Sequence, residues 1–233
     1  LKIDALEHDW HVHRVFHFDF NGVDFTMPGA LHLKIEGYLY DWEEEFGISS
    51  GVDTNLGSRF NRILQAAAEQ TGRGAVVLVD EYDKPLLDVL EKDPELLEQN
   101  REILKAFYSV FKLADASLRF VFLTGVTKFS QVSVFSGFNQ PKDISMFDKY
   151  EALCGITEEE LHTQFAEPIR EMAASEGCTE EEMRQRLKRH YDGYHFSKEM
   201  TDIYNPFSVL NAFDSQDIRD FGLLRAHRRI SFA

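Results

Sequence analysis

The chain has 233 residues, of which 43% are hydrophobic, and it carries a formal net charge of −15 at pH 7. This length allows one large domain or a domain with an appendage. The negative charge argues against a surface that wraps nucleic acid by neutralising phosphates. No apolar run approaches the ~18 residues of a membrane span and no secretory signal is visible, so we expect a cytoplasmic protein without membrane contact.

Two cysteines, Cys154 and Cys178, form no CxxC pair. We therefore expect neither a disulfide framework nor a zinc site. The chain begins with Leu rather than Met, which suggests a fragment of a longer protein.

The first half of the chain alternates between strand and helix patterns. Aromatic residues at alternate positions predict a strand over 14–20, which ends in the carboxylate Asp19. Helical spacing predicts helices over 31–46, with Glu43 to Glu45 on the outside, and over 55–70. The loop 51–58 superficially resembles a phosphate-binding loop, but its glycine spacing is one residue too long and it lacks the lysine.

The run Ala-Val-Val-Leu-Val at 75–79 predicts a strand buried on both faces, as in a parallel sheet. It ends abruptly in Asp80 and Glu81, in the pattern of a Walker B motif. Ligands bind at the carboxyl ends of such strands. In this motif the aspartate holds Mg²⁺ and the following glutamate can polarise the attacking water. Asp83, shortly after, is either an orienting residue for this site or a charge at a helix N-terminus.

A long helix is predicted over 94–114, followed by a second buried strand over 118–123. That strand ends in Thr124, where AAA-type ATPases place a polar residue that senses the γ-phosphate, and Lys128 follows within reach of a phosphate. Ordinary turn chemistry is the alternative for both residues. The strand-helix-strand order predicts a right-handed parallel unit whose strand tips share one edge.

Beyond residue 150 the pattern becomes helical. Thr157 with Glu160, and Thr179 with Glu182, have the capping-box spacing, and Asn205-Pro206 begins a further helix. We therefore predict an α/β core over 1–150, a helical lid-like section over 151–221 and an atypical basic tail over 222–233.

Seven motifs in one order resemble the AAA-ATPase-like family of bacterial and protist proteins: VDEYDKPL (79–86), LTGVTKFS (123–130), SVFSGFN (133–139), DIS (143–145), LCGITEEEL (153–161), YDGYHF (191–196) and YNPFSVLN (204–211). The family implies a P-loop NTPase fold, a three-layer domain with a parallel sheet, often joined to a PD-(D/E)XK nuclease-like domain. It implies ATP and Mg²⁺, with Asp80 at the metal, Asp80 and Lys128 at the nucleotide, and Glu81 and Thr124 in catalysis.

Two departures from the family pattern limit this expectation. The phosphate-loop segment RPRRFGKS of the family is absent from these residues, so the α/β domain is expected to be incomplete, and both binding and hydrolysis of ATP are expected to be impaired. The tail from Gly222 differs from the family pattern, which suggests a reading-frame change or a divergent end.

Two other functions remain open. The first is a nucleotide-regulated switch or interaction module without turnover, acting through a protein partner or self-association. The second is a metal-dependent hydrolase or nuclease built on Asp19, Asp80 and Glu81, although the lysine of a nuclease motif does not follow Glu81.

Overall fold

The computed structural model describes residues 5–49, 53–126, 141–145, 147–150, 152–194 and 203–219. The chain separates into two compact units, Leu1–Lys142 and Asp143–Ala233. Lys128, most of motif 123–130, motif 133–139 and the tail 222–233 lie outside the described residues. No helix in the described ranges is long and apolar enough to cross a membrane.

The first unit is an α/β domain built on a three-stranded parallel sheet of order β1-β2-β3. Its elements are β1 (Val15–Asp19), α1 (Ala30–Phe46), α2 (Leu56–Thr71), β2 (Ala75–Asp80), α3 (Lys84–Leu87), α4 (Pro94–Tyr108), α5 (Val110–Leu113), a 3₁₀ turn (Asp115–Ser117) and β3 (Leu118–Leu123). The α/β class and the parallel strands are confirmed. The helix predicted over 94–114 is interrupted at Ser109.

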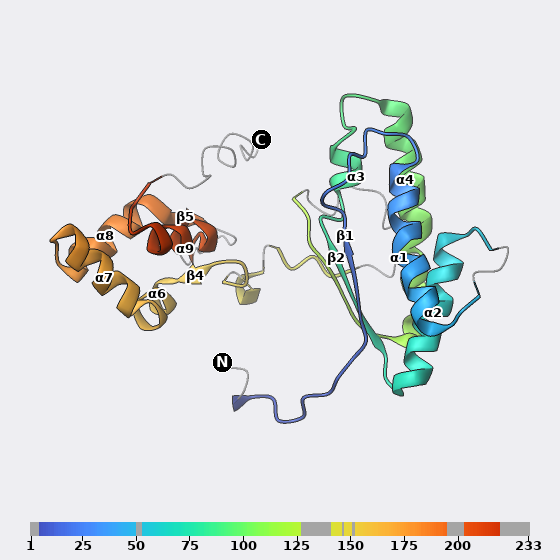
Figure 1. The fold of residues 1–233 in the computed structure, drawn as a ribbon, viewed down its shortest axis with the longest axis horizontal. Helices are drawn as coiled ribbons and strands as arrows, with labels where there is room; N and C mark the ends of the chain where they lie inside the picture. The colour runs from blue at the N-terminus through green and yellow to red at the C-terminus, as the bar shows by residue number, and fades with distance from the viewer. Residues whose placement is uncertain are drawn as a thin grey trace. The chain divides into compact units, whose positions relative to one another are not determined.

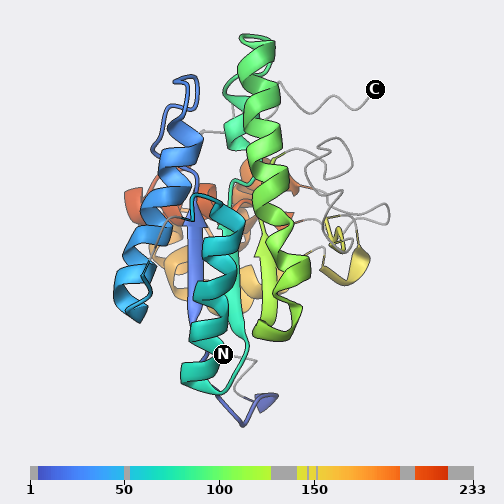
Figure 2. The same cartoon turned by 90° about the vertical axis from the view of Figure 1, so that its right-hand side faces the viewer.

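Helices α1, α2 and α4 lie on one side of the sheet (Figures 1 and 2). On this side alternate residues of β1 and β2, such as Phe16, Phe18 and Val77, are fully buried. The Phe18 ring makes edge contacts with several aromatic rings. Its centroid lies 4.9 Å from that of Trp42 and 5.1 Å from that of Phe60. Burial of these rings supplies the main driving force for docking the helices on the sheet.

The opposite face of the sheet is less covered than the sequence predicts. Val76 and Leu78 of β2 are only half-buried, and Val15 and Phe120 are exposed by 47% and 52%. The prediction that the strand at 75–79 is buried on both faces is therefore wrong, because the helices among the described residues cover only one face of the sheet. A third layer stays a prediction.

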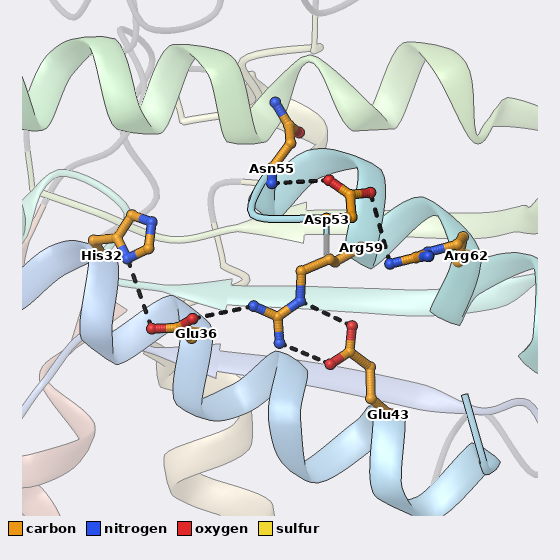
Figure 3. A network of polar contacts seen from close by, with 7 residues as sticks. All are labelled: His32, Glu36, Glu43, Asp53, Asn55, Arg59 and Arg62. Atoms are coloured by element: carbon orange, nitrogen blue, oxygen red, sulfur yellow. Dashed lines mark hydrogen bonds and ion pairs between the residues drawn. The ribbon is translucent and has the colours of Figure 1, made fainter. Parts of the chain in front are cut away.

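Helices α1 and α2 are joined by a buried ion pair (Figure 3). The Arg59 guanidinium donates from Nε and Nη2 to the two carboxylate oxygens of Glu43, at 2.9 and 2.7 Å, and from Nη1 to Glu36 at 3.3 Å. Glu43 is only 3% exposed, so its predicted place on the outside of the helix is wrong. The cause is Arg59 on the facing helix, which compensates the buried carboxylate.

The second unit is mainly helical. It contains a 3₁₀ turn (Asp148–Tyr150), β4 (Ile156–Thr157), α6 (Glu158–Gln164), α7 (Ala166–Glu176), α8 (Glu180–Tyr191), β5 (Asp192–Tyr194), β6 (Ile203–Tyr204) and α9 (Pro206–Ser215). The capping box of Thr157 and Glu160 is formed, and Asn205 caps α9 by accepting from the Ser208 amide at 2.9 Å. A small antiparallel sheet of order β4-β6-β5 was not predicted.

Candidate functional site

The sheet register brings the polar strand ends into one row. Asp19 at the end of β1 pairs with Asp80 at the end of β2. On the other side of β2, Val79 pairs with Leu123, the last residue of β3, so Thr124 follows directly after that strand. The predicted convergence of Asp80, Glu81 and Thr124 at one edge is therefore present in the structure. The catalytic and metal-binding roles of these residues stay predictions.

Thr124 is bound to the end of β2 by several hydrogen bonds. Its hydroxyl donates to Asp80 Oδ1 and accepts from the Glu81 amide at 3.4 Å. Its own amide donates to the Val79 carbonyl and its carbonyl accepts from the Tyr82 amide, both at 2.9 Å. The pairing between β2 and β3 thus continues past the strands and holds the hydroxyl beside the carboxylate.

Glu81 adopts a left-handed backbone conformation with φ of 51°. This region is uncommon for residues other than glycine and indicates local strain. At this turn the chain passes from the partly exposed pair Asp80 and Glu81 to the buried pair Tyr82 and Asp83.

Asp83 is buried, with 1% of its surface exposed. It precedes α3, but its side chain makes no capping hydrogen bond to that helix. Instead its carboxylate accepts from the Val126 amide, at 3.1 Å to Oδ2 and 3.4 Å to Oδ1. This contact joins the connections after β2 and β3, while Asp83 also stands at the N-terminus of α3. Both predicted roles of Asp83 stay predictions.

Tyr108 of α4 lies close to the same turn. Burial raises the pKa of its phenol well above the ordinary value, and the neighbouring Tyr82 and Asp83 raise it further. The phenol of Tyr108 therefore stays neutral at physiological pH.

Asp19 sits beside the site and is held through its backbone. Its amide donates to the Tyr38 hydroxyl at 3.1 Å, and its carbonyl accepts from the same hydroxyl at 3.0 Å. The Asn21 amide donates to its carboxylate at 2.8 Å and lowers the pKa of Asp19. In the described part of the chain no three acidic, histidine or cysteine side chains are grouped to hold a metal ion, so the hydrolase reading built on Asp19, Asp80 and Glu81 gains no support.

Sequence reasoning did not single out Gly125. A β-carbon there would lie 2.5 Å from the Tyr82 ring and 2.6 Å from Asp83 Oδ1. A side chain at position 125 would thus push the two connections apart. The available signal was a glycine directly after a polar strand end, where close approach of the backbone is common.

Open parallel α/β sheets bind their ligands at the carboxyl ends of the strands, which is where Asp80 and Thr124 lie. The sequence profile of the AAA-ATPase-like family, described as "Predicted AAA-ATPase", matches residues 1–135. Because this match spans more than half of the sequence, the chain belongs to the AAA-ATPase-like family.

A relative extends the similarity to most of the chain. An "Uncharacterized protein in vnfD 5′region" of Azotobacter chroococcum mcd 1 is 38% identical over 214 residues, which cover 91% of this chain. The chain spans only 39% of the length of that relative. No solved structure matches the chain.

Proposed function

We propose that this chain carries the water-activating side of an ATPase site. The observation that carries the proposal is the row of Asp80, Glu81 and Thr124 at the carboxyl edge of the sheet, with the Thr124 hydroxyl on the Asp80 carboxylate. Phosphoryl transfer to water requires charge neutralisation and an oriented nucleophile rather than covalent chemistry by the protein. Membership of the family supports a nucleotide as the ligand.

Each residue of the row has a separate role in this proposal. Glu81 orients the attacking water and takes its proton, because its carboxylate follows the metal-binding position directly. Thr124 donates its hydroxyl to the γ-phosphate or to the water. Lys128, which follows in sequence, is proposed to contact phosphate.

The oxygen atoms at this edge fit Mg²⁺. Mg²⁺ is usually bound by one or two carboxylates together with water and substrate phosphates. Asp80 supplies such a carboxylate, and its partial exposure leaves room for a ligand. When bound, Mg²⁺ neutralises negative charge on the phosphates, while Asp80 is the residue that holds it and Thr124 orients Asp80.

The test is the substitution Glu81→Gln in the full-length protein, because these residues alone lack the phosphate loop, with phosphate release from MgATP as the measurement. Loss of the general base is expected to lower turnover about 100-fold or more, with ATP affinity changed less than about threefold. The matched control is Glu91→Gln, because Glu91 lies outside the site and shares the positive φ of Glu81. Its turnover is expected to stay at the wild-type level.

Two results would contradict the proposal. Unchanged turnover in Glu81→Gln would show that Glu81 takes no part in the reaction, and a full-length wild-type protein that does not bind MgATP would show that ATP is not the ligand. Binding of ATP without turnover in the wild type would favour the nucleotide-regulated switch instead.

A further inference from the structure

The Thr124 hydroxyl needs support from outside its own strand. It is exposed, and among the described strands β3 pairs only with β2, at the end of the sheet order. A functional side chain in such a place keeps its geometry only if neighbouring residues restrict it.

The Asp83 carboxylate is placed to restrict the connection after β3, which carries Thr124. It accepts from the Val126 amide, two residues beyond Thr124, while Tyr82 donates its amide to the Thr124 carbonyl. These contacts hold the connection on both sides of Gly125. Burial of Asp83 shields this hydrogen bond from water and so strengthens it.

The packing around Gly125 complements that hydrogen bond. The Tyr82 ring and Asp83 Oδ1 occupy the space that a β-carbon at position 125 would need. The two connections therefore touch closely, so a displacement of Asp83 displaces the backbone next to Thr124. The left-handed turn at Glu81 precedes the two buried residues that make this contact.

We propose that Asp83 is a positioning residue, which holds the connection after β3 through the Val126 amide and so keeps the Thr124 hydroxyl on Asp80 and Glu81. The expected effect of Asp83 on turnover rests on the proposed ATPase function, whereas its effect on the position of Thr124 can be tested without any turnover. Gly125 is the complementary position, where only a residue without a side chain permits the contact.

The geometric test follows the methyl signal of Thr124 by NMR in the intact protein with labelled threonine methyl groups, assigned with Thr124→Ser. Asp83→Ala is expected to shift the signal and broaden it by exchange. Asp83→Asn is expected to keep it near the wild-type position, because the amide oxygen still accepts from Val126. An unchanged Thr124 signal in Asp83→Ala would overturn the proposal.

The control is Asp93→Ala. Asp93 also accepts two backbone amides, those of Glu95 and Leu96 at 3.1 and 3.0 Å, but it caps α4 rather than joining the two connections. Its loss is expected to lower stability without moving the Thr124 signal. If Asp83→Ala does not fold, Gly125→Ala serves instead, since its β-carbon displaces Tyr82 and Asp83 and is expected to shift the same signal. No shift there would overturn the proposal.

The functional test compares turnover of MgATP in the same variants. Asp83→Ala is expected to lower kcat at least about tenfold with KM changed less than about threefold, because misplacement of a catalytic group by about 1 Å has effects of this size. Asp83→Asn restores most of kcat, and Asp93→Ala leaves it unchanged. A wild type without turnover would refute the ATPase proposal, and the methyl signal would still decide the role of Asp83.

Discussion

Glu81 combines a functional position with an unfavourable backbone conformation. Its φ of 51° lies in the left-handed region, which costs a residue with a side chain roughly 1–2 kcal/mol. Glycine would adopt this conformation without that cost. The sequence places a carboxylate here instead, at the residue proposed to activate water.

This conflict predicts that Glu81→Gly stabilises the protein while it abolishes turnover. Relief of the left-handed conformation outweighs the extra entropy of glycine in the unfolded chain, so the free energy of unfolding of the first unit is expected to rise by about 0.5–1 kcal/mol. Urea unfolding followed by circular dichroism measures the change.

Glu91→Gly is the matched control for this prediction. Glu91 has φ of 63° and lies outside the candidate site. It is expected to show a similar gain in stability with turnover intact. A loss of stability in Glu81→Gly together with a gain in Glu91→Gly would mean that the Glu81 side chain itself stabilises the fold.

The position of the candidate site could be predicted from the sequence, but its internal contacts could not. Asp80, Glu81 and Thr124 each follow an apolar run, and parallel strands place such ends at one edge. The contact of Asp83 with Val126 follows a left-handed turn at Glu81, where the sequence has no glycine to indicate such a turn. Lys128 lies outside the described residues, so its predicted role is not tested.

A buried ion pair between Arg59 and Glu43 joins helices α1 and α2. Arg59 and Glu43 are 4% and 3% exposed, and two hydrogen bonds join them. Glu43 pairing raises the pKa of Arg59, so the guanidinium stays charged. A buried pair of this kind is costly to break from one side because the remaining charge loses its partner.

Arg59→Leu is therefore expected to lower the free energy of unfolding of the first unit by about 3 kcal/mol. The double variant Arg59→Leu with Glu43→Leu is expected to recover much of that loss, because no unpaired buried charge remains; Glu36, which also loses Arg59, has a side chain that is 44% exposed. Urea unfolding of both variants gives the two values.

Arg62→Leu provides the control for a more exposed pair. Arg62 lies 3.6 Å from Asp53, and both side chains are about one-third exposed. Its effect is expected to stay below about 1 kcal/mol. An Arg59→Leu variant no more destabilised than Arg62→Leu would show that the buried pair contributes little.

The elements themselves were predicted well where a periodic pattern is long. Strands 75–80 and 118–123 match their predicted ranges, α1 begins one residue earlier than predicted, and α2 begins and ends one residue later than predicted. The antiparallel sheet of β4, β5 and β6 was missed because its strands have only two or three residues, too short for a periodic signal. Glu43 was misplaced because helical spacing does not reveal a charged partner on another helix.

The described residues form two hydrophobic cores with no residue in common. One includes Phe18 and the aromatic cluster of the α/β unit, and the other includes Leu187 and Met172 of the helical unit. Cores of separate units can unfold in separate cooperative steps, so a single two-state transition is not expected.

Calorimetry of the wild type and of one variant in each core tests this expectation. Phe18→Ala is expected to lower only the free energy of unfolding of the first unit, by about 3–5 kcal/mol. Leu187→Ala is expected to lower only that of the second unit, by about 2–5 kcal/mol. A single transition that both variants shift equally would show instead that the two units unfold together.

The parallel sheet also sets the order in which the chain can fold. Val15 pairs with Val76, and Ala75 pairs with Leu118, so each strand meets its neighbour only across a long helical connection. Such non-local pairing slows folding, because loop closure must precede the contacts that stabilise it. During synthesis β1 therefore leaves the ribosome well before its partner exists, and the row of Asp19, Asp80 and Thr124 is completed only when the third strand has emerged.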